Sequence, residues 1–388
     1  MKIGIITFWN SNDNYGQLLQ AWALQKWLKR NGHNPFIIKY TLQTPNTPLI
    51  KKIAIYFFKT ILIYPIFVKL FNIIKQKKRL QINHDNLRQF NRFRNDELIF
   101  SKNEYNCLID LQKFPPEADC YITGSDQVWA QLLSFEENQA YFLNFGNEKI
   151  KRIAYAPSFS MLNYPPKLIN KLQQQLKKFN AISVREKTGL NICNKAGFKA
   201  ETVCDPTLLL NANDYADIIE KQNNTSNYIY IYSLNISSKK DIYWDELYSF
   251  ASNHNLKIRV TTASGYIPAK EIFNKKHVEY DYATISKWLF NIQNAQLVVT
   301  SSFHGIVFSI IMHTPFIYIP LKGKFSKGNN RITDLLDYLE LNHRILKTNT
   351  TFTDIYNSKI HWNKVFNLLN TYQEKSKLFL IKNLNKDS

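Results

Sequence analysis

The chain has 388 residues, of which 50 are Lys or Arg and 30 are Asp or Glu, so its formal net charge is +20. Apolar residues form 45% and aromatic residues 14% of the sequence, which excludes a largely disordered chain and is enough for a sizeable core. The length suits two domains rather than one. The N-terminus has too short an apolar run for a signal peptide. The four cysteines show neither a CxxC pair nor a zinc-ligand spacing, so we interpret them as reduced thiols of a cytoplasmic protein: Cys107, Cys120, Cys193 and Cys204.

The first forty residues predict a strand–helix–strand unit. The apolar run Lys2–Phe8 is typical of a buried strand, Gln17–Arg30 is rich in helix formers, and Pro35–Tyr40 is a second strand. Asn31-Gly32 is a helix stop. A strand, helix and strand in this order predict a parallel sheet.

The positive charge is concentrated in the segment that follows. Residues 14–84 contain no Asp or Glu but twelve Lys and Arg side chains. Within them, Leu49–Arg79 alternates apolar clusters with lysines, and Lys59, Pro65 and Lys69 interrupt it too often for a spanning helix of about 20 apolar residues. We expect a pair of basic amphipathic helices on an anionic membrane surface. Two core helices with snorkelling lysines are the alternative.

The rest of the chain returns to an alternation of strands and helices. The polar stretch Glu220–Asn227 predicts a linker between two such series. We therefore predict an α/β protein with two Rossmann-like lobes, residues 1–220 and 227–350, facing a central cleft, and a helical extension over 351–388. In open sheets of this kind, ligands bind beyond the carboxyl ends of the strands. Strands, with the turns and helices that they lead into, are expected within Ala118–Trp129, Lys151–Ser160, Ala181–Leu190, Ala200–Leu210, Asn227–Leu234, Leu256–Ala263, Gln296–Thr300 and Pro315–Pro320, and a helix within Lys167–Phe179.

A histidine follows one of the strands of the second lobe. Gly305–His313 has a helical pattern, so Ser301 or Ser302 caps this helix and His304 falls in its first turn. Backbone N–H groups at that position bind anions, and the helix dipole disfavours imidazolium by about 0.3–1 kcal/mol. We predict that His304 is neutral and able to take up a proton. A buried structural histidine is the alternative.

Three other positions at strand or helix ends carry polar side chains. The turn TGSDQVW places Ser125 and Asp126 beyond a strand, although Asp126 is also a candidate helix cap. Arg185 ends another strand and suits bidentate binding of a carboxylate or phosphate, with an ion pair to Glu186 or another acid as the alternative. Arg331 starts a helix, where a positive charge is unfavourable unless an anion lies nearby. Together these residues predict a cleft that binds a small, multiply charged anion and a hydroxyl nucleophile.

The motifs NYGQLLQAWAL, TGSDQVW, YAPSFS, SVREKTG, DPTLLL, SSFHGIVFSI and NNRITDLL occur in this order along the chain. This order resembles the polysaccharide pyruvyl transferase family from about Met1 to about Leu346, most strongly at GSDQVW and SSFHG. The resemblance implies a fold like that of GT-B glycosyltransferases. It also implies transfer of the enolpyruvyl group of phosphoenolpyruvate onto two sugar hydroxyls, which gives a cyclic pyruvate ketal and free phosphate. No cofactor and no metal are expected.

The resemblance assigns roles to individual residues. His304 is expected to be the principal acid and base, while Asp126 orients a sugar hydroxyl or relays the proton. Arg185 and Arg331 are expected to hold the donor. Some family members have an arginine where this chain has Phe303, so Arg331 or a lysine would have to replace that contact. The other expected substrate-binding residues come from the same motifs: Asn14, Tyr15, Gly16, Ser125, Gln127, Ser158, Ser301, Ser302 and Phe303.

The expected partners are phosphoenolpyruvate and a sugar acceptor of capsule or exopolysaccharide synthesis, carried on a lipid. The basic segment Leu49–Arg79 would hold the enzyme at the inner face of the cell membrane. No nucleic acid is expected, because the charge lies in an apolar segment rather than among stacking aromatic residues on a polar face. A GT-B glycosyltransferase that uses a nucleotide sugar is the alternative activity.

Overall fold

The computed structural model describes residues 1–11, 14–41, 87–130, 133, 135–221, 227–236, 238–262, 273 and 275–385. The basic segment Leu49–Arg79, with its predicted helix pair, lies outside the described residues, as does most of the predicted linker. Within the described ranges, no helix is both long and apolar enough to cross a bilayer.

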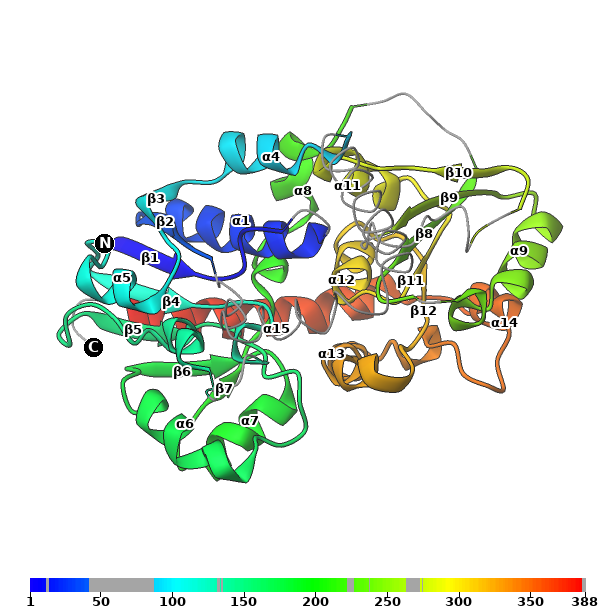
Figure 1. Ribbon diagram of the computed structural model, residues 1–388. Helices are drawn as coiled ribbons and strands as arrows, with labels where there is room; N and C mark the ends of the chain where they lie inside the picture. Colours follow the sequence, from blue (N-terminus) through cyan, green and yellow to red (C-terminus); the bar gives the residue numbers. More distant parts are fainter. Residues whose placement is uncertain are drawn as a thin grey trace, which may run out of the picture.

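The first lobe is built on a parallel sheet of seven strands in the order β3-β2-β1-β4-β5-β6-β7 (Figure 1). β1 lies inside the sheet, where Ile3 pairs with Pro35 of β2 and with Cys120 of β4. Helices cover both faces, so the central strands are continuous apolar runs rather than alternating ones. The strands are β1 Lys2–Ile6, β2 Asn34–Tyr40, β3 Phe100–Tyr105, β4 Cys120–Thr123, β5 Lys151–Ala154, β6 Ala181–Val184 and β7 Glu201–Thr202; the helices are α1 Tyr15–Arg30, α4 Phe90–Glu97, α5 Leu108–Lys113, α6 Ile169–Leu176 and α7 Lys187–Lys195.

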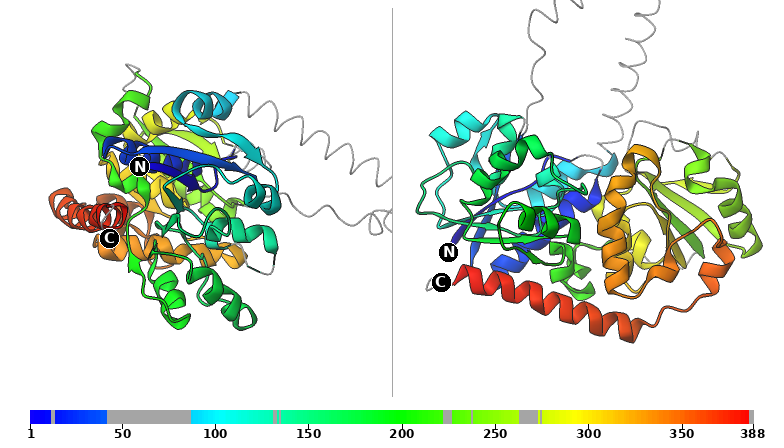
Figure 2. Two further views of the ribbon diagram at one scale, coloured as in Figure 1. Left: turned by 90° about the vertical axis from the view of Figure 1, so that its left-hand side faces the viewer. Right: turned by 90° about the horizontal axis from the view of Figure 1, so that it is seen from below.

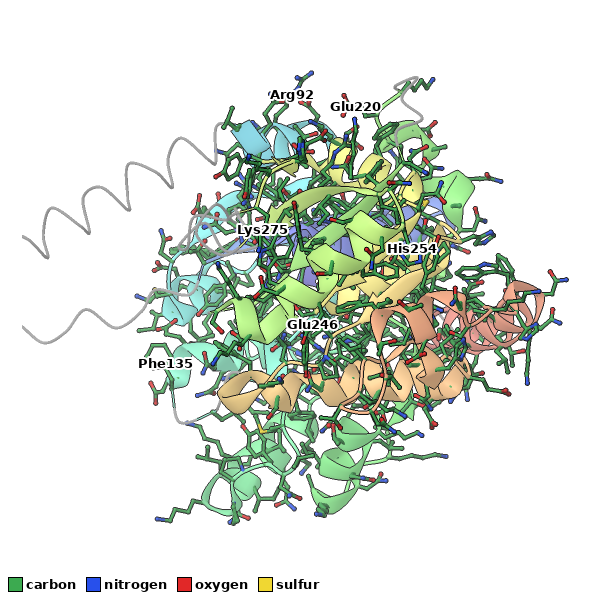
Figure 3. All side chains as sticks on the ribbon, turned by 90° about the vertical axis from the view of Figure 1, so that its right-hand side faces the viewer. Arg92, Phe135, Glu220, Glu246, His254 and Lys275 are labelled. Carbon is green, nitrogen blue, oxygen red and sulfur yellow. The ribbon has the colours of Figure 1, made fainter. Side chains whose placement is uncertain are left out.

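The second lobe repeats this architecture with a parallel sheet of five strands in the order β10-β9-β8-β11-β12. Side chains fill the space between its layers, while Glu246 and Lys275 lie on its outer surface (Figure 3). The strands are β8 Tyr228–Ser233, β9 Lys257–Thr262, β10 Val278–Tyr280, β11 Leu297–Thr300 and β12 Phe316–Tyr318; the helices are α9 Trp244–Asn253, α11 Ile285–Gln293, α12 Phe303–Ile311, α13 Asn330–Tyr338 and α14 Phe352–Asn357. The short helix α8 Ala212–Tyr215 precedes this sheet and is bonded to α1 of the first lobe.

The last helix, α15 (Trp362–Leu384), runs back along both lobes, so the two ends of the chain lie close together (Figures 1 and 2). Ser376 of α15 accepts a hydrogen bond from the backbone N–H of Cys204 at 2.9 Å, and Phe379 packs near Tyr155 of the first lobe. At its other end, His313 of the second lobe stacks on Trp362. α15 is therefore a second connection between the lobes, in addition to their direct contact through α1.

That direct contact is mainly aromatic. Tyr15 of α1 stacks on Trp288 of α11 with ring centroids 5.2 Å apart, and its hydroxyl donates to the carbonyl of Ala283 at 2.7 Å. Tyr215 meets Phe308 of α12 edge to face. One apolar core thus continues from the first lobe into the second, which fixes the strand ends of the two sheets against each other.

The predicted fold class is confirmed, with differences at element ends and at two strands. α1 begins at Tyr15 and α12 at Phe303, two residues earlier than the patterns predict, because Asn14 and Ser302 cap them. β3 was not predicted because its sequence, FSKNEY, has three consecutive exposed residues. β10 was also missed, since it has only three residues and none of them is fully buried.

Candidate active site

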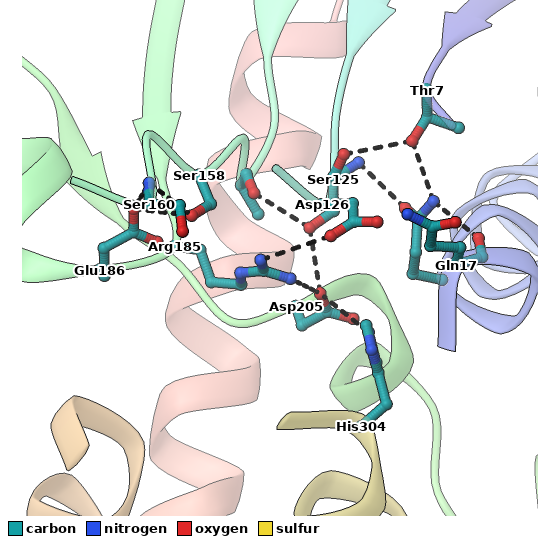
Figure 4. Close-up of polar contacts among 12 residues, drawn as sticks. Thr7, Gln17, Ser125, Asp126, Ser158, Ser160, Arg185, Glu186, Asp205 and His304 are labelled. Carbon is teal, nitrogen blue, oxygen red and sulfur yellow. Dashed lines mark hydrogen bonds and ion pairs between the residues drawn. The ribbon is translucent and has the colours of Figure 1, made fainter. Parts of the chain in front are cut away.

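The candidate site lies where the carboxyl ends of strands from both sheets meet (Figure 4). Ser125 and Asp126 follow β4, Arg185 follows β6 and Asp205 follows β7, whereas His304 reaches them from the first turn of α12. All five are at most 5% exposed. The structure therefore brings together the predicted residues Ser125, Asp126, Arg185 and His304, and adds Asp205 to them.

Asp205 is the centre of the hydrogen-bond network. Its Oδ1 accepts from the backbone N–H and the hydroxyl of Thr207, at 3.1 and 2.7 Å. Its Oδ2 accepts from Arg185 Nη1 at 2.7 Å and lies 3.0 Å from Ser125 Oγ. Burial alone would raise the pKa of Asp205, but the nearby His304 and Arg185 and the hydrogen bonds from Thr207 outweigh burial and hold that pKa well below its usual range. Asp205 is therefore a carboxylate at neutral pH.

His304 is held between this carboxylate and α1. Its Nε2 lies 3.7 Å from Asp205 Oδ2, so the carboxylate is a counterion whenever the ring is protonated. A Cβ atom on Gly16 would lie 2.0 Å from Nδ1, which shows how closely the ring approaches the backbone of α1. Ser302 caps α12 through a hydrogen bond from the Gly305 N–H. His304 Nε2 has no hydrogen-bond partner among the described residues, which argues against a satisfied structural histidine.

Two guanidinium groups lie over the ring of Phe303. The Cζ atom of Arg185 is 4.7 Å from the ring centroid and that of Arg331 is 5.7 Å from it. Burial, together with the charge of Arg185, lowers the pKa of Arg331 to about 10. For Arg185 burial acts in the same direction, but Asp205, Asp126 and Glu186 outweigh it and raise its pKa. The arrangement puts Arg331 beside Phe303.

Several donors and acceptors of this group are buried without a hydrogen-bond partner among the residues that the structure describes. They are Nε and Nη2 of Arg185, Nε of Arg331, Oδ2 of Asp126 and Oε2 of Glu186. The ion pair considered as an alternative for Arg185 is present, with Asp205 rather than Glu186, yet it uses only Nη1. Nη2 is 3.8 Å from Asp126 Oδ1, which is too long for a hydrogen bond. Unsatisfied buried groups are expected where a ligand completes the site.

Asp126 and Glu186 are the other two acids near the arginines. Asp126 has a positive φ of 67°, and its carbonyl oxygen accepts from the Ser158 N–H at 2.8 Å. No helix-capping hydrogen bond to its carboxylate occurs among the described residues. Glu186 accepts from Ser158 Oγ at 2.8 Å and from the Phe159 N–H at 3.0 Å, and burial raises its pKa. Asp126 is thus oriented toward the cluster, while Glu186 orders the loop after β5.

The other predicted substrate-binding residues surround this cluster in different ways. With its amide oxygen turned toward Arg331, Gln127 accepts from Nη2 at 3.0 Å and donates to Ser160 Oγ at 3.1 Å. Asn14 caps α1 through the Gln17 N–H. Ser301 exchanges hydrogen bonds with the backbone of Leu234 after β8.

Tyr15 is turned into the contact between the lobes instead of toward the cluster, since its hydroxyl bonds Ala283. Tyr15, Asn14 and Ser301 therefore support the site rather than line it in the described structure.

Sequence reasoning missed two residues. Asp205 begins the quoted motif DPTLLL, in which an Asp-Pro pair follows a short strand. Such a pair indicates a helix cap rather than a catalytic network. Gln20 is fully buried in α1, donates to Thr7 Oγ1 at 2.9 Å and accepts from the Ser125 N–H at 3.1 Å. A glutamine among the apolar residues of α1 was its only signal in the sequence.

Comparison with known families decides the relationship. A family model described as polysaccharide pyruvyl transferase matches residues 14–323. The chain belongs to the polysaccharide pyruvyl transferase family. Its members are transferases of polysaccharide pyruvylation, which agrees with the resemblance of the motifs. No curated protein matches the chain in sequence.

Solved structures show the same two-lobed fold at low sequence identity. UDP-GlcNAc 2-epimerase from Methanocaldococcus jannaschii is 11% identical, with 98% of this chain and 100% of that chain covered and a TM-score of 0.50. Arabidopsis thaliana UGT89C1 complexed with UDP-L-rhamnose is 10% identical, with 99% and 97% covered and a TM-score of 0.48. The glycotransferase of kitacinnamycin is 12% identical, with 99% of both chains covered and a TM-score of 0.48. These likenesses concern the GT-B fold alone.

Proposed function

We propose that the protein transfers the enolpyruvyl group of phosphoenolpyruvate onto two hydroxyls of one sugar, forming a cyclic pyruvate ketal and releasing phosphate. The observation that carries the proposal is the set of buried, unpaired polar atoms on Arg185, Arg331, His304 and Asp126. Leaving such groups unsatisfied costs about 1–3 kcal/mol each. The carboxylate and phosphate of the donor would accept hydrogen bonds from the two arginines, its double bond would take the proton of His304, and a sugar hydroxyl would donate to Asp126.

The donor would be held by the arginines. Phosphoenolpyruvate carries two anionic groups, and guanidinium groups bind carboxylate and phosphate through paired hydrogen bonds. Arg185 keeps Nε and Nη2 available beside its ion pair with Asp205, and Arg331 keeps Nε available. Both guanidinium groups lie over the Phe303 ring, and an apolar neighbour of this kind strengthens their interaction with an anion.

In place of the neutral ring expected from the helix dipole, the mechanism starts from His304 protonated beside the carboxylate of Asp205. In the first half of the reaction, His304 donates this proton to C3 of the donor. A sugar hydroxyl adds at C2 and gives its proton to Asp126. Asp205 is the fixed counterion of His304 and keeps the ring oriented, as the 3.7 Å separation allows. The product of this half is a tetrahedral carbon that still bears the phosphate.

In the second half, the bond between C2 and the oxygen of the phosphate group breaks, and its electron pair leaves with the phosphate. The second hydroxyl of the sugar attacks the resulting oxocarbenium carbon and gives its proton to His304. Asp126 returns its proton to the departing phosphate, which leaves as hydrogen phosphate. Both residues then have their starting protonation, and protons and charge balance over the cycle.

We further propose a lipid-linked acceptor at the inner face of the membrane. The support is the acid-free segment Leu49–Arg79, whose lysines suit an anionic surface. The membrane would then present the lipid-linked acceptor to the enzyme bound at its surface.

The test is to incubate the protein with phosphoenolpyruvate and a panel of lipid-linked hexosides. The expected result is a pyruvate mass gain on one acceptor with equimolar phosphate release. A parallel thermal-shift series with phosphoenolpyruvate and with uridine and guanosine nucleotide sugars separates the proposal from the glycosyltransferase alternative. Stabilisation by a nucleotide sugar but not by phosphoenolpyruvate, together with sugar transfer, would replace the proposal with that alternative.

A further inference from the structure

A cavity of about 90 Å³ lies on the side of the arginine pair that faces α13 and α15. Its walls include Arg185, Arg331 and Phe303 from the candidate site, and Tyr338 and Tyr372 from the two helices. A single water needs roughly 10–15 Å³ of such space, so the cavity has room for several waters or one small anion. The cavity therefore adjoins the candidate site: Asp205 also lines it, whereas Asp126 and His304 do not.

The cavity is lined by four cationic side chains from four segments of the chain: Arg185 after β6, Lys187 in α7, Arg331 in α13 and Lys375 in α15. The two arginines are buried or half-buried, while the two lysines are exposed. Nε and Nη2 of Arg185 have no hydrogen-bond acceptor in the described part of the chain. The cavity thus combines buried donors at its inner end with mobile cations at its outer end.

The acids at the cavity do not cancel these charges. Asp205 is already engaged by Arg185 and Thr207, and Asp334 accepts the backbone N–H of Lys187 at 2.8 Å. Lys187 Nζ is 3.5 Å from Asp337, an exposed pair of the kind that contributes little and exchanges easily. Lys375 forms no ion pair with a described acid. An anion in the cavity would find two lysines available.

We propose that this cavity is the phosphate port of the enzyme: orthophosphate binds there between the arginines and Lys187 and Lys375, and leaves between α13 and α15. The proposal rests on the proposed function, in which the C2–O bond breaks and the phosphate departs with the electron pair. The other product remains attached to the sugar, so phosphate is the small anion that must leave a buried site. Lysine suits release because it is a flexible, hydrated point charge, whereas the arginines bind by fixed geometry.

Inorganic phosphate alone is the probe, and its dissociation constant is measured by calorimetry for the wild type, Lys187→Ala and Lys375→Ala. Lys382→Ala is the matched control, because Lys382 is on α15 two turns beyond Lys375 and does not line the cavity. Each cavity variant is expected to weaken phosphate binding roughly threefold to tenfold, as for the loss of one charged contact. The control keeps the wild-type value. Product inhibition of pyruvyl transfer by phosphate should also weaken in the two cavity variants and remain unchanged in the control.

The outcomes separate this inference from the proposed function. Equal phosphate affinity in all four proteins, or no phosphate binding by the wild type, overturns the port even if pyruvyl transfer is normal. Lysine-dependent phosphate binding without turnover on any acceptor supports the anion site and overturns the proposed function. Turnover with product inhibition that weakens in Lys375→Ala supports both.

Discussion

Gly16→Ala tests the position of His304 with the smallest change available. A Cβ atom at residue 16 would lie 2.0 Å from His304 Nδ1 and 2.1 Å from Cγ, where ordinary contacts begin at 3.4 Å. The imidazole therefore has to retreat by about 1.4 Å or rotate away from α1 and Asp205. A displacement of about 1 Å in a reacting group is enough to cost on the order of a hundredfold in rate.

The assay is kcat/KM for phosphoenolpyruvate in the pyruvyl-transfer reaction, with circular dichroism and thermal unfolding on the same samples. Alanine is the better helix former by about 1 kcal/mol, so a loss of activity with little loss of stability is the expected pattern. Gly328→Ala is the matched control, because its Cβ would meet only Arg331 Nη2, at 3.7 Å. If Gly16→Ala keeps wild-type kcat/KM in a folded protein, the close approach of His304 to α1 is not part of the active arrangement.

Three further predictions concern Asp205, Arg185 and the basic segment. Asp205→Asn removes the charge facing Arg185 and His304, so it should lower the free energy of unfolding by about 3–5 kcal/mol at neutral pH, measured by urea titration. Because the folded-state pKa of Asp205 is depressed, its contribution to stability is present above the unfolded value near 3.9 and is lost as the pH falls toward the folded value. The difference in unfolding free energy between wild type and Asp205→Asn should therefore narrow below about pH 4, and a difference that widens in acid would contradict the assignment. Arg185→Lys loses the fixed pair of donors and should raise KM for phosphoenolpyruvate by about tenfold or more, against no change for the exposed Arg92→Lys; equal KM values would remove Arg185 from the donor site. Deletion of residues 49–79 should abolish flotation with anionic liposomes, and equal recovery of the deleted and full-length proteins would reject the membrane contact.

The elements that could be predicted from sequence are those whose signals are local. Ser301-Ser302 and the apolar run after it predicted the helix that carries His304, and the helix formers from Gln17 predicted α1, each within two residues of its start. Both depend on neighbouring residues, so no knowledge of the tertiary structure was needed. The parallel sheets followed from the strand–helix alternation in the same way.

What could not be predicted are contacts between residues far apart in the chain. Asp205 is 80 residues from Ser125 and 20 from Arg185 along the chain, and nothing in the neighbouring sequence indicates that it hydrogen-bonds to both. Gly16 approaches His304 across the contact between the lobes. The reason why residue 16 must lack a side chain is therefore visible only in the folded protein. Tyr15 was predicted to bind substrate as part of the motif NYGQLLQAWAL, but successive positions of a helix face different directions and its ring packs on Trp288.

The most direct test of the central claim is kcat/KM for phosphoenolpyruvate-dependent ketal formation by His304→Gln, compared with His313→Gln. His313 follows the same helix but stacks on Trp362, away from the arginines. The account predicts a loss of at least about a hundredfold for His304→Gln, as expected when a general acid–base group is removed, and near wild-type activity for His313→Gln. Near wild-type activity of a folded His304→Gln protein would contradict it.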